Sequence, residues 1–323
     1  MIIDGRRIGG EAPCYLVAEV GASHGGSYAR AQELIRIAAT VGAAAVKLQC
    51  YAADDMTLDR DGPGFVVPPG SPWAGRRLYD LYREAGTPPA WMPGLFATAR
   101  EVGIACFATP FHPRHVPILE DLGAPAYKIA SFELGWPDLL RAVARTRKPV
   151  LLSTGLSRWR EVAAALDVLA EEGCGADRLA VLRCASAYPA PLDAVNLRAL
   201  RTLRAALDAR GLVSACVGLS DHTRVALAPV LAVALGAAIV ERHLRLDDDD
   251  SPDATFASDP ETWRHMAISV WRAEVALGGG ALVPHAAEAA SESFRRRELP
   301  DGRWVRCGVE ALDEARRLGE VRA

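Results

Sequence analysis

Residues 15–49, with the sequence YLVAEVGASHGGSYARAQELIRIAATVGAAAVKLQ, contain the pattern that decides the fold. Two short apolar runs, at 15–20 and 44–49, predict buried strands. Residues 29–41 between them have the spacing of an amphipathic helix, and Gly42 follows where a helix C-terminus favours glycine. Strand, helix and strand in this order predict a parallel sheet covered by helices.

The same pattern repeats along the chain. Further strands are predicted at 104–108, 126–130, 150–153, 180–184, 214–218 and 238–241. Amphipathic stretches at 114–122, 136–145, 160–172, 197–210 and 224–235 separate them, and a last helix is predicted at 260–277. Eight such repeats predict an α/β fold of the (β/α)8 TIM-barrel class. The rival is a doubly wound open sheet, which normally has fewer strands and a G-x-G-x-x-G turn that this sequence lacks.

Two segments interrupt the repeat. Residues 51–75 are rich in glycine and proline and predict a long loop after the second strand, followed by an inserted helix near 76–85. Residues 244–259 predict a loop after the eighth strand, and the aspartates at 248–250 within it predict a solvated turn. Both loops are expected at the C-terminal face of the barrel, where active sites of this fold are built.

Composition restricts the classes of function. The 323 residues are 50% hydrophobic and 24% charged, as in an ordinary folded protein, and the net charge of −3 offers no basic surface for nucleic acid. No run of eighteen apolar residues predicts a membrane helix, and the charged N-terminus does not resemble a signal peptide. Seven scattered cysteines without a C-x-x-C motif favour a reducing compartment, so a cytoplasmic location is expected.

Lysine is scarce in this chain. Of 37 basic residues only Lys47, Lys128 and Lys148 are lysines, and arginine supplies the rest. A lysine retained against this bias indicates a role that arginine fills poorly. It carries a compact charge on a flexible stem, which suits binding of a phosphate or carboxylate in a pocket.

Polar residues follow almost every predicted strand at its C-terminal end, where a barrel places functional groups. The residues concerned are Glu19, Ser23, His24, Lys47, Gln49, Thr109, Lys128, Ser131, Glu133, Ser153, Thr154, Ser186, Tyr188, Ser220, Asp221, His222, Glu241 and His243. A single serine or threonine is more often a structural polar group. Polar residues at eight strand ends on the same edge predict a functional site.

Two subsets of these residues have a recognisable chemistry. Two lysines and four hydroxyls would form an anion site for a small ligand that carries both phosphate and carboxylate. That subset is Lys47, Lys128, Thr109, Ser131, Ser153 and Ser220. The second subset is His222 and His243 on adjacent strands, which predict a divalent-metal site with open positions; the alternative is two structural histidines.

The stretches that carry these residues resemble motifs of the N-acetylneuraminate (sialic acid) synthase family. They occur in the family's order within about residues 13–278. They are AEVGASHGG at 18–26, VKLQ at 46–49, FATPF at 107–111, YKIASFE at 127–133, LSTG at 152–155, CASAYP at 184–189, GLSDHT at 218–223 and ERH at 241–243. Eight ordered motifs make the resemblance specific.

The resemblance implies an enzyme, a transferase that condenses phosphoenolpyruvate with an aldehyde sugar, typically an N-acetylated hexosamine. In that reaction C3 of phosphoenolpyruvate attacks the aldehyde, water adds to C2, and phosphate leaves by C–O cleavage. The partners expected are therefore these two small molecules, with no nucleic acid and no membrane. A homodimer remains open.

The resemblance also assigns roles to residues. Lys128, Thr109, Ser131 and Ser153 would hold the phosphate, and Lys47, Ser220 and Ser186 the carboxylate. His222 and His243 would hold Mn²⁺ or Mg²⁺. Glu19 would act as the general acid–base group, and Glu241 would belong to the substrate-binding residues. Gln49, Tyr188 and Asp253 would contact the sugar.

The sequence departs from the family pattern at several places. Ser23 stands where asparagine is usual, Arg183 where histidine is usual, and Ala254 where a second histidine is usual. Residues 1–278 are expected to form the synthase barrel, and residues 279–323 a short C-terminal tail rather than a full antifreeze-like domain. N-acetylmannosamine is therefore expected to be a poor acceptor.

Two other interpretations stay open at this point. One is an aldolase-type lyase on the same barrel, and the other is a non-catalytic homologue or sugar-phosphate sensor. The joint presence of Glu19, Lys47, Lys128, His222 and His243 favours the enzyme, because an inactive homologue has no reason to retain all five.

Overall fold

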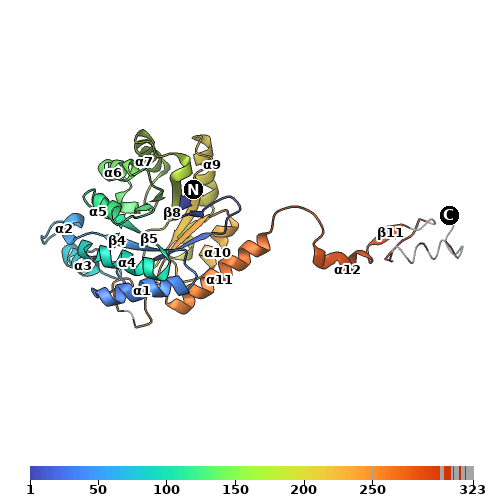
Figure 1. Cartoon of the computed structure of the whole chain (residues 1–323), viewed down its shortest axis with the longest axis horizontal. Helices are drawn as coiled ribbons and strands as arrows, with labels where there is room; N and C mark the ends of the chain where they lie inside the picture. Colours follow the sequence, from blue (N-terminus) through green and yellow to red (C-terminus); the bar gives the residue numbers. More distant parts are fainter. Residues whose placement is uncertain (249, 299–301, 307, 309–312, 314–316, 318–323) are drawn as a thin grey trace. The chain divides into compact units, whose positions relative to one another are not determined.

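The structure is a computed structural model that describes residues 1–248, 250–298, 302–306, 308, 313 and 317 (Figure 1). Its contacts divide the chain into two compact units, Met1–Ala276 and Leu277–Ala323. The larger unit contains the sequence-predicted site residues. In the described part of the chain, no helix is both long and apolar enough to cross a membrane.

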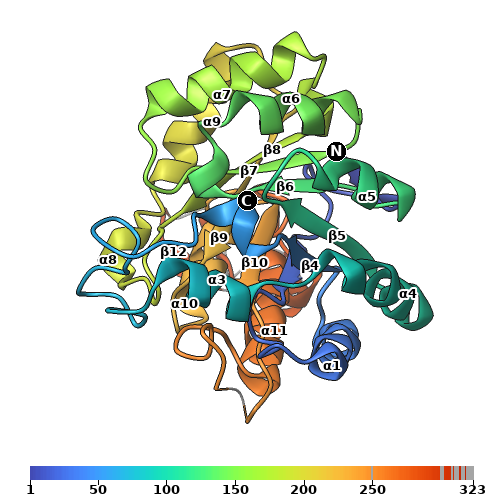
Figure 2. The same ribbon diagram turned by 90° about the vertical axis from the view of Figure 1, so that its left-hand side faces the viewer.

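Eight parallel strands close into a barrel in the order β10-β3-β4-β5-β6-β7-β8-β9. Their bounds are β3 Tyr15–Glu19, β4 Ala45–Cys50, β5 Ala105–Pro110, β6 Tyr127–Ile129, β7 Val150–Ser153, β8 Leu179–Cys184, β9 Cys216–Asp221 and β10 Ile239–His243. Figure 2 shows these strands with helices around them. The predicted TIM barrel is confirmed, and every predicted strand overlaps an observed one.

Helices cover the outside of the barrel. They are α1 Tyr28–Thr40, α4 Met92–Val102, α5 His115–Asp121, α6 Pro137–Arg145, α7 Trp159–Glu171, α9 Ala199–Ala209, α10 Leu227–Ala234 and α11 Pro260–Leu277. Shorter helices are α2 Ala53–Met56, α3 Leu78–Ala85 and α8 Leu192–Val195, with 3₁₀ turns η1 Pro89–Trp91, η2 Ser131–Glu133 and η3 Ala176–Arg178. α4 was not predicted from the sequence, because Pro93 and Gly94 are residues that usually interrupt a helix. Both lie in the first turn of α4, where proline is tolerated.

Two apolar layers hold the barrel together. Alternate strand residues point outward to the helices or inward to the barrel axis. The inner layer includes Val17, Phe107 and Leu182, and it is continued by Ile3 and Ile8 from the N-terminal segment. That segment contains the antiparallel strands β1 Ile2–Ile3 and β2 Arg6–Arg7, which the sequence patterns did not predict.

Glycine closes the helix-to-strand joints as expected. Gly103 follows α4 with φ +70°, and its amide donates to the carbonyls of Ala99 and Arg100 at the end of the helix. A side chain would disfavour this left-handed conformation. The chain can therefore turn directly into β5.

The insertion after β4 is more ordered than the predicted loop. Val66 and Arg77 form an antiparallel bridge, and the amides of Val67 and Gly75 donate to the carbonyls of Arg76 and Val67, each at 2.9 Å. Residues 65–78 thus form a hairpin-like arm, here called the 65–78 arm. The long loop predicted at 51–75 therefore contains local backbone pairing that satisfies some of its polar groups, and α3 follows it near the position predicted for the inserted helix.

The segment after β10 is tied to the barrel at both ends. Leu244 and Ser258 form a parallel bridge, and the solvated turn contains an exposed Asp248 that pairs with Arg30 at 3.1 Å. Residue 249, within the predicted solvated turn, lies outside the described residues.

The smaller unit contains η4 Ala286–Glu288, α12 Ala289–Glu292 and an antiparallel pair, β11 Arg296–Glu298 and β12 Trp304–Arg306. Most of residues 299–323, with Cys307, lie outside the described residues. The assignment of 279–323 as a tail stays a prediction. The six described cysteines are all buried and free.

A buried ion pair joins β9 to β10. Arg242 donates to Asp221 at 2.7 Å, and both side chains are almost fully shielded from water. Ser258 accepts from the Arg242 Nε at 2.6 Å, and Thr223 donates to Asp221 through its amide and its hydroxyl. Alternation then directs the neighbouring residues, His222 and His243, to the other side of the strands.

Asp221→Ala should therefore destabilise the protein by about 3–5 kcal/mol, because it leaves the Arg242 charge buried without a carboxylate. Arg145→Ala, which breaks an exposed pair with Glu172, is the matched control and should cost less than about 1 kcal/mol. Urea unfolding measures both. Equal losses in the two variants would contradict this role for the buried pair.

Candidate functional site

The strand register brings the first site residues together. Glu19 on β3 lies beside Lys47 on β4 and beside His243 on β10. Glu241 precedes His243 by two residues and therefore shares its side of the strand. Neighbouring Ser220 on β9 is in register with Glu241. Five predicted residues thus lie together on the inner side of three pairs of adjacent strands.

Two lysines and two glutamates form a buried charge cluster. Lys47 Nζ lies 2.5 Å from Glu19 Oε2 and 3.9 Å from Glu241 Oε2. Lys128 Nζ lies 3.7 Å from Glu241 Oε1. All four side chains are nearly inaccessible to water. Such charges are tolerated in a protein interior only when they are paired, so each residue of this cluster depends on the others.

The two lysines have different electrostatic surroundings. Burial acts to lower the pKa of Lys47, but Glu19 and Glu241 outweigh it and raise that pKa above its ordinary value. Burial dominates for Lys128, whose pKa is lowered. Burial also opposes ionisation of Glu241, yet Lys128 and Lys47 lower its pKa to about 2. Lys128 is therefore the cation that an additional anion would stabilise most.

Hydroxyl groups surround the cluster. Lys47 Nζ donates to Thr109 Oγ1 at 3.1 Å, and Ser220 donates to Glu241 at 2.9 Å. The hydroxyl of Ser153 is buried without a hydrogen-bond partner among the described residues. A buried polar group of this kind is costly unless a ligand satisfies it. Ser153 is thus a candidate ligand contact, as the sequence predicted.

Ser131 and Ser186 meet at Gly155. The Gly155 amide donates to Ser131 Oγ at 2.9 Å. A Cβ at Gly155 would collide with the hydroxyls of both serines. The glycine of the LSTG motif therefore allows backbone and hydroxyls to approach one another, and it brings together two more of the predicted residues.

Glu133 was predicted at the end of a strand but without a role in the site. It ends η2, directly after β6, and one of its carboxylate oxygens is buried without a hydrogen-bond partner among the described residues. Burial raises its pKa to about 7, although Lys128 acts in the opposite direction. Its place five residues after Lys128 in YKIASFE was the available signal. A carboxyl with this pKa can exchange protons near neutrality.

The two histidines lie side by side, with ring centroids 5.4 Å apart. His222 Nδ1 is 2.9 Å from the Ala185 carbonyl, which can only accept, so Nδ1 carries the proton. His243 Nδ1 lies 3.0 Å from Asp253 Oδ2. Both contacts direct Nε2 away from the protein partner, which is the arrangement typical of metal-binding histidines.

Asp253 is itself fixed by the chain around it. Its Oδ2 also accepts from the Ala22 amide at 2.9 Å. A Cβ at Gly21 would collide with the Asp253 carboxylate and with the His243 ring. The family resemblance implied that Asp253 contacts the sugar; in the structure its carboxylate contacts the His243 ring, and the sugar role stays a prediction. Within the described residues, no group of three His, Cys, Asp or Glu side chains is arranged to hold a metal.

The remaining predicted residues border this site. Gln49 donates to Glu19 Oε1 at 2.8 Å, and the Tyr188 ring lies 4.4 Å from that of His222. Cys184, which was not predicted as a site residue, has Sγ 3.9 Å from His222 Nδ1. Burial opposes its ionisation, but His222 and Lys128 lower its pKa to about 7.

His24 belongs to a different environment. Its ring is buried, accepts from the Gly26 amide and pairs with Thr87 at 3.0 Å, and it packs edge-on against Trp91. Burial lowers its pKa to about 4. These contacts give it a structural role at the start of α1.

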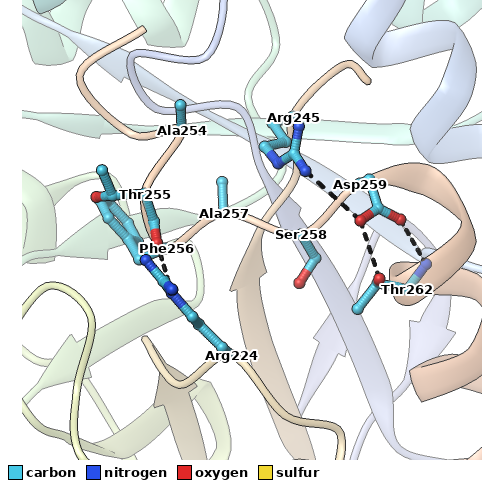
Figure 3. Close-up of a pocket in the computed structure, with 9 residues that line it drawn as sticks. All are labelled: Arg224, Arg245, Ala254, Thr255, Phe256, Ala257, Ser258, Asp259 and Thr262. Atoms are coloured by element: carbon cyan, nitrogen blue, oxygen red, sulfur yellow. Dashed lines mark hydrogen bonds and ion pairs between the residues drawn. The ribbon is translucent and has the colours of Figure 1, made fainter. Parts of the chain in front are cut away.

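A hollow of about 300 Å³ lies on the segment after β10 (Figure 3). It is lined by Arg224, Arg245, Ala254, Thr255, Phe256, Ala257, Ser258, Asp259 and Thr262. None of these was among the predicted site residues. Its arginines brace the segment: Arg224 donates to the Thr255 carbonyl at 2.7 Å, and Arg245 lies 3.6 Å from Asp259. The hollow borders the site through Phe256, which also packs against His243.

Glu133→Gln should stabilise the protein at pH 8 by up to about 3 kcal/mol and leave its stability unchanged at pH 4. The pKa of this carboxyl is raised on folding, so the folded state binds the extra proton and loses stability as pH rises toward 7. Thermal unfolding at both pH values measures the effect, with Glu171→Gln on the exposed end of α7 as control. A Glu133→Gln variant that is no more stable at pH 8 would contradict the raised pKa.

Comparison with known proteins agrees with this geometry. Residues 34–281 match the NeuB family. The pseudaminic acid synthase of Campylobacter jejuni subsp. jejuni serotype O:23/36 is 38% identical over 83% of this chain and 76% of its own length. The N,N'-diacetyllegionaminic acid synthase of C. jejuni serotype O:2 is 30% identical over 88% of this chain and 83% of its own.

Solved structures give the same result. The crystal structure of N-acetylneuraminic acid synthetase from Leptospira borgpetersenii aligns with a TM-score of 0.78 and 27% identity, covering 91% of this chain and 95% of that one. A truncated 3-deoxy-D-arabino-heptulosonate 7-phosphate synthase from Thermotoga maritima shares the fold alone, at 13% identity and a TM-score of 0.62. The match to the family profile and to these synthases shows that the chain belongs to the NeuB family.

Proposed function

We propose that this NeuB-family enzyme condenses phosphoenolpyruvate with an aldehyde sugar to give a 2-keto sugar acid and phosphate. The observation that carries the proposal is the pair of buried lysines, Lys47 and Lys128, at the C-terminal end of the barrel. Two cations and a set of hydroxyls match a small ligand with one phosphate and one carboxylate. The relatives named above are synthases of sugar acids, which supports the same product class.

Lys128 is assigned to the phosphate, together with Thr109, Ser131 and Ser153. Two observations support this assignment. Burial lowers the pKa of Lys128 because the nearby carboxylates do not fully offset it, and the Ser153 hydroxyl has no hydrogen-bond partner among the described residues. Lys47 is assigned to the carboxylate, together with Ser220 and Ser186. A bound anion would then replace part of the contact that Glu19 and Glu241 make with the lysines.

The two histidines fit a divalent metal ion, Mn²⁺ or Mg²⁺. Their Nδ1 atoms are occupied by Ala185 and Asp253, so both Nε2 atoms remain as ligands, and the open positions suit water and substrate oxygens. When bound, the ion supplies Lewis acidity toward the aldehyde oxygen. The chain's own residues then bind phosphoenolpyruvate and the sugar next to each other.

The chemistry forms one carbon–carbon bond and breaks one carbon–oxygen bond. C3 of phosphoenolpyruvate attacks the aldehyde carbon, whose oxygen takes up a proton. Water adds to C2 and gives up a proton, and the C2–O bond to phosphate then breaks. The products are the 2-keto acid and inorganic phosphate, and no oxidant or reductant is needed.

Two carboxyls with different surroundings divide the proton transfers. Glu133, with a pKa of about 7, supplies the proton to the aldehyde oxygen. Glu19, a carboxylate paired with Lys47 and oriented by Gln49, accepts the proton from water. Different surroundings of two carboxyls in one site commonly separate the acid from the base.

Lys128→Ala should weaken phosphoenolpyruvate binding by about 2–4 kcal/mol, because it removes one partner of a buried charge contact. Lys148→Ala is the matched control: Lys148 pairs with Glu120 at 2.7 Å and lies outside the cluster. The Michaelis constant for phosphoenolpyruvate, from phosphate release with a panel of aldoses, measures the effect. Unchanged affinity in Lys128→Ala would remove the basis for this ligand.

His222→Ala should abolish turnover with the fold intact, and excess chelator should do the same to the wild-type protein. Titration with Mn²⁺, followed by electron paramagnetic resonance of the free ion, should show one tight site that the variant lacks. Circular dichroism checks the fold. Full activity of the wild type in excess chelator would rule out the metal.

A further inference from the structure

Arg183 joins the two ends of the loop that follows β8. Its neighbour Leu182 belongs to the inner apolar layer, so alternation along the strand directs the Arg183 side chain outward, toward the helices. There Nε donates to the Val195 carbonyl and Nη2 to the Ala194 carbonyl, each at 2.9 Å. Nη1 donates to the carbonyl of Cys184. One guanidinium therefore contacts both the last residue of β8 and the last two residues of α8.

The chemistry of these contacts is one that arginine supplies well. The guanidinium carries its donors in a rigid, planar fork, and it keeps its charge in the half-buried position of Arg183. The final carbonyls of a helix have no partner within the helix, and they favour a cation. Hydrogen bonds from a charged donor are also stronger than those between neutral groups. Arg183 thus fixes both ends of the loop at 185–191, at a position where histidine is usual in the family pattern.

The loop that Arg183 closes surrounds His222. The Ala185 carbonyl accepts from His222 Nδ1 at 2.9 Å, and the Ala190 amide donates to the His222 carbonyl, also at 2.9 Å. Tyr188, between these two residues, has its ring centroid 4.4 Å from that of the imidazole. One loop therefore holds both the ring and the backbone of His222.

The contact with Ala185 sets which ring nitrogen of His222 carries the proton. A neutral imidazole has one N–H and a carbonyl can only accept, so the proton stays on Nδ1 and Nε2 keeps its lone pair. His243 is oriented differently, by the carboxylate of Asp253. His222 depends instead on the position of one backbone carbonyl, and that position depends on how the ends of its loop are anchored.

We propose that Arg183 is a positioning residue for His222: by fixing both ends of the loop after β8, it holds the Ala185 carbonyl against Nδ1 and leaves Nε2 free for a divalent metal ion. Arg183 points away from the site and acts only through this loop. The metal part of the inference rests on the proposed function, whereas the tautomer of His222 does not. Removal of a group that orients a metal ligand typically weakens metal binding by about 10–100-fold.

The test compares Arg183→Met, which keeps the apolar stem but has no donor, with Arg183→Lys, which keeps the charge. Arg204→Met is the matched control, because Arg204 donates in the same way to the carbonyls of Leu212 and Ala215, just before β9 and thus at the opposite end of the barrel. Long-range ¹H–¹⁵N spectra of metal-free protein labelled with ¹⁵N-histidine give the tautomer of His222, at a pH where the imidazole is neutral. His222→Ala identifies its signals. Electron paramagnetic resonance of free Mn²⁺ measures metal binding.

The wild type should carry the His222 proton on Nδ1. Arg183→Met should show a mixture of the two tautomers and bind Mn²⁺ about tenfold or more weakly, with Arg183→Lys between it and the wild type. Arg204→Met should keep the wild-type tautomer and an affinity within about twofold of the wild type, because its loss does not reach the loop after β8.

An Nε2 proton in the wild type, or an Arg183→Met variant that retains the Nδ1 tautomer or the wild-type affinity, would overturn the inference. An equal change in Arg204→Met would also overturn it, because general destabilisation produces that result. If Arg183→Met does not fold, Arg183→Lys carries the same comparison. If the wild type binds no Mn²⁺, the proposed metal role fails, and the tautomers of the metal-free proteins still decide the inference.

Discussion

The site is organised around the contact between Lys47 and Glu19, 2.5 Å apart on neighbouring strands inside the barrel. A lysine cannot stay charged in such an interior without a carboxylate, so the register of β3 with β4 is fixed by chemistry as well as by hydrogen bonds. Glu241 extends the same pairing to Lys128. The closed barrel, the buried cations and the carboxylates that hold them are therefore one interdependent structure.

Most of the fold could be predicted from the sequence, because most strands and helices have their own local pattern of residues. Apolar runs such as residues 150–153 match the observed strand, and glycines such as Gly103 mark the joints. The barrel and its eight strands were predicted in this way. The order of the 65–78 arm could not be, because it depends on pairing between Val66 and Arg77 and on the contact of Trp73 with Pro252.

Most residues of the site could be predicted from the sequence, but the contacts between them could not. Strand ends supplied Lys47, Lys128, Glu241 and the two histidines, and the closed barrel brings them to one edge. The pKa of Glu133 could not be predicted, because it follows from burial beside Lys128. Trp73, Tyr188 and Phe256 pack against one another, but their separation in the chain conceals any pattern.

The central claim is that the lysine cluster binds phosphoenolpyruvate for attack at C3 followed by C–O cleavage. Phosphoenolpyruvate labelled with ¹⁸O at the bridging oxygen tests it, with mass spectrometry of the phosphate released in the presence of an aldose acceptor. The account predicts that phosphate release requires the aldose and that the phosphate retains the label. Unlabelled phosphate, or release that is independent of the aldose, would contradict it.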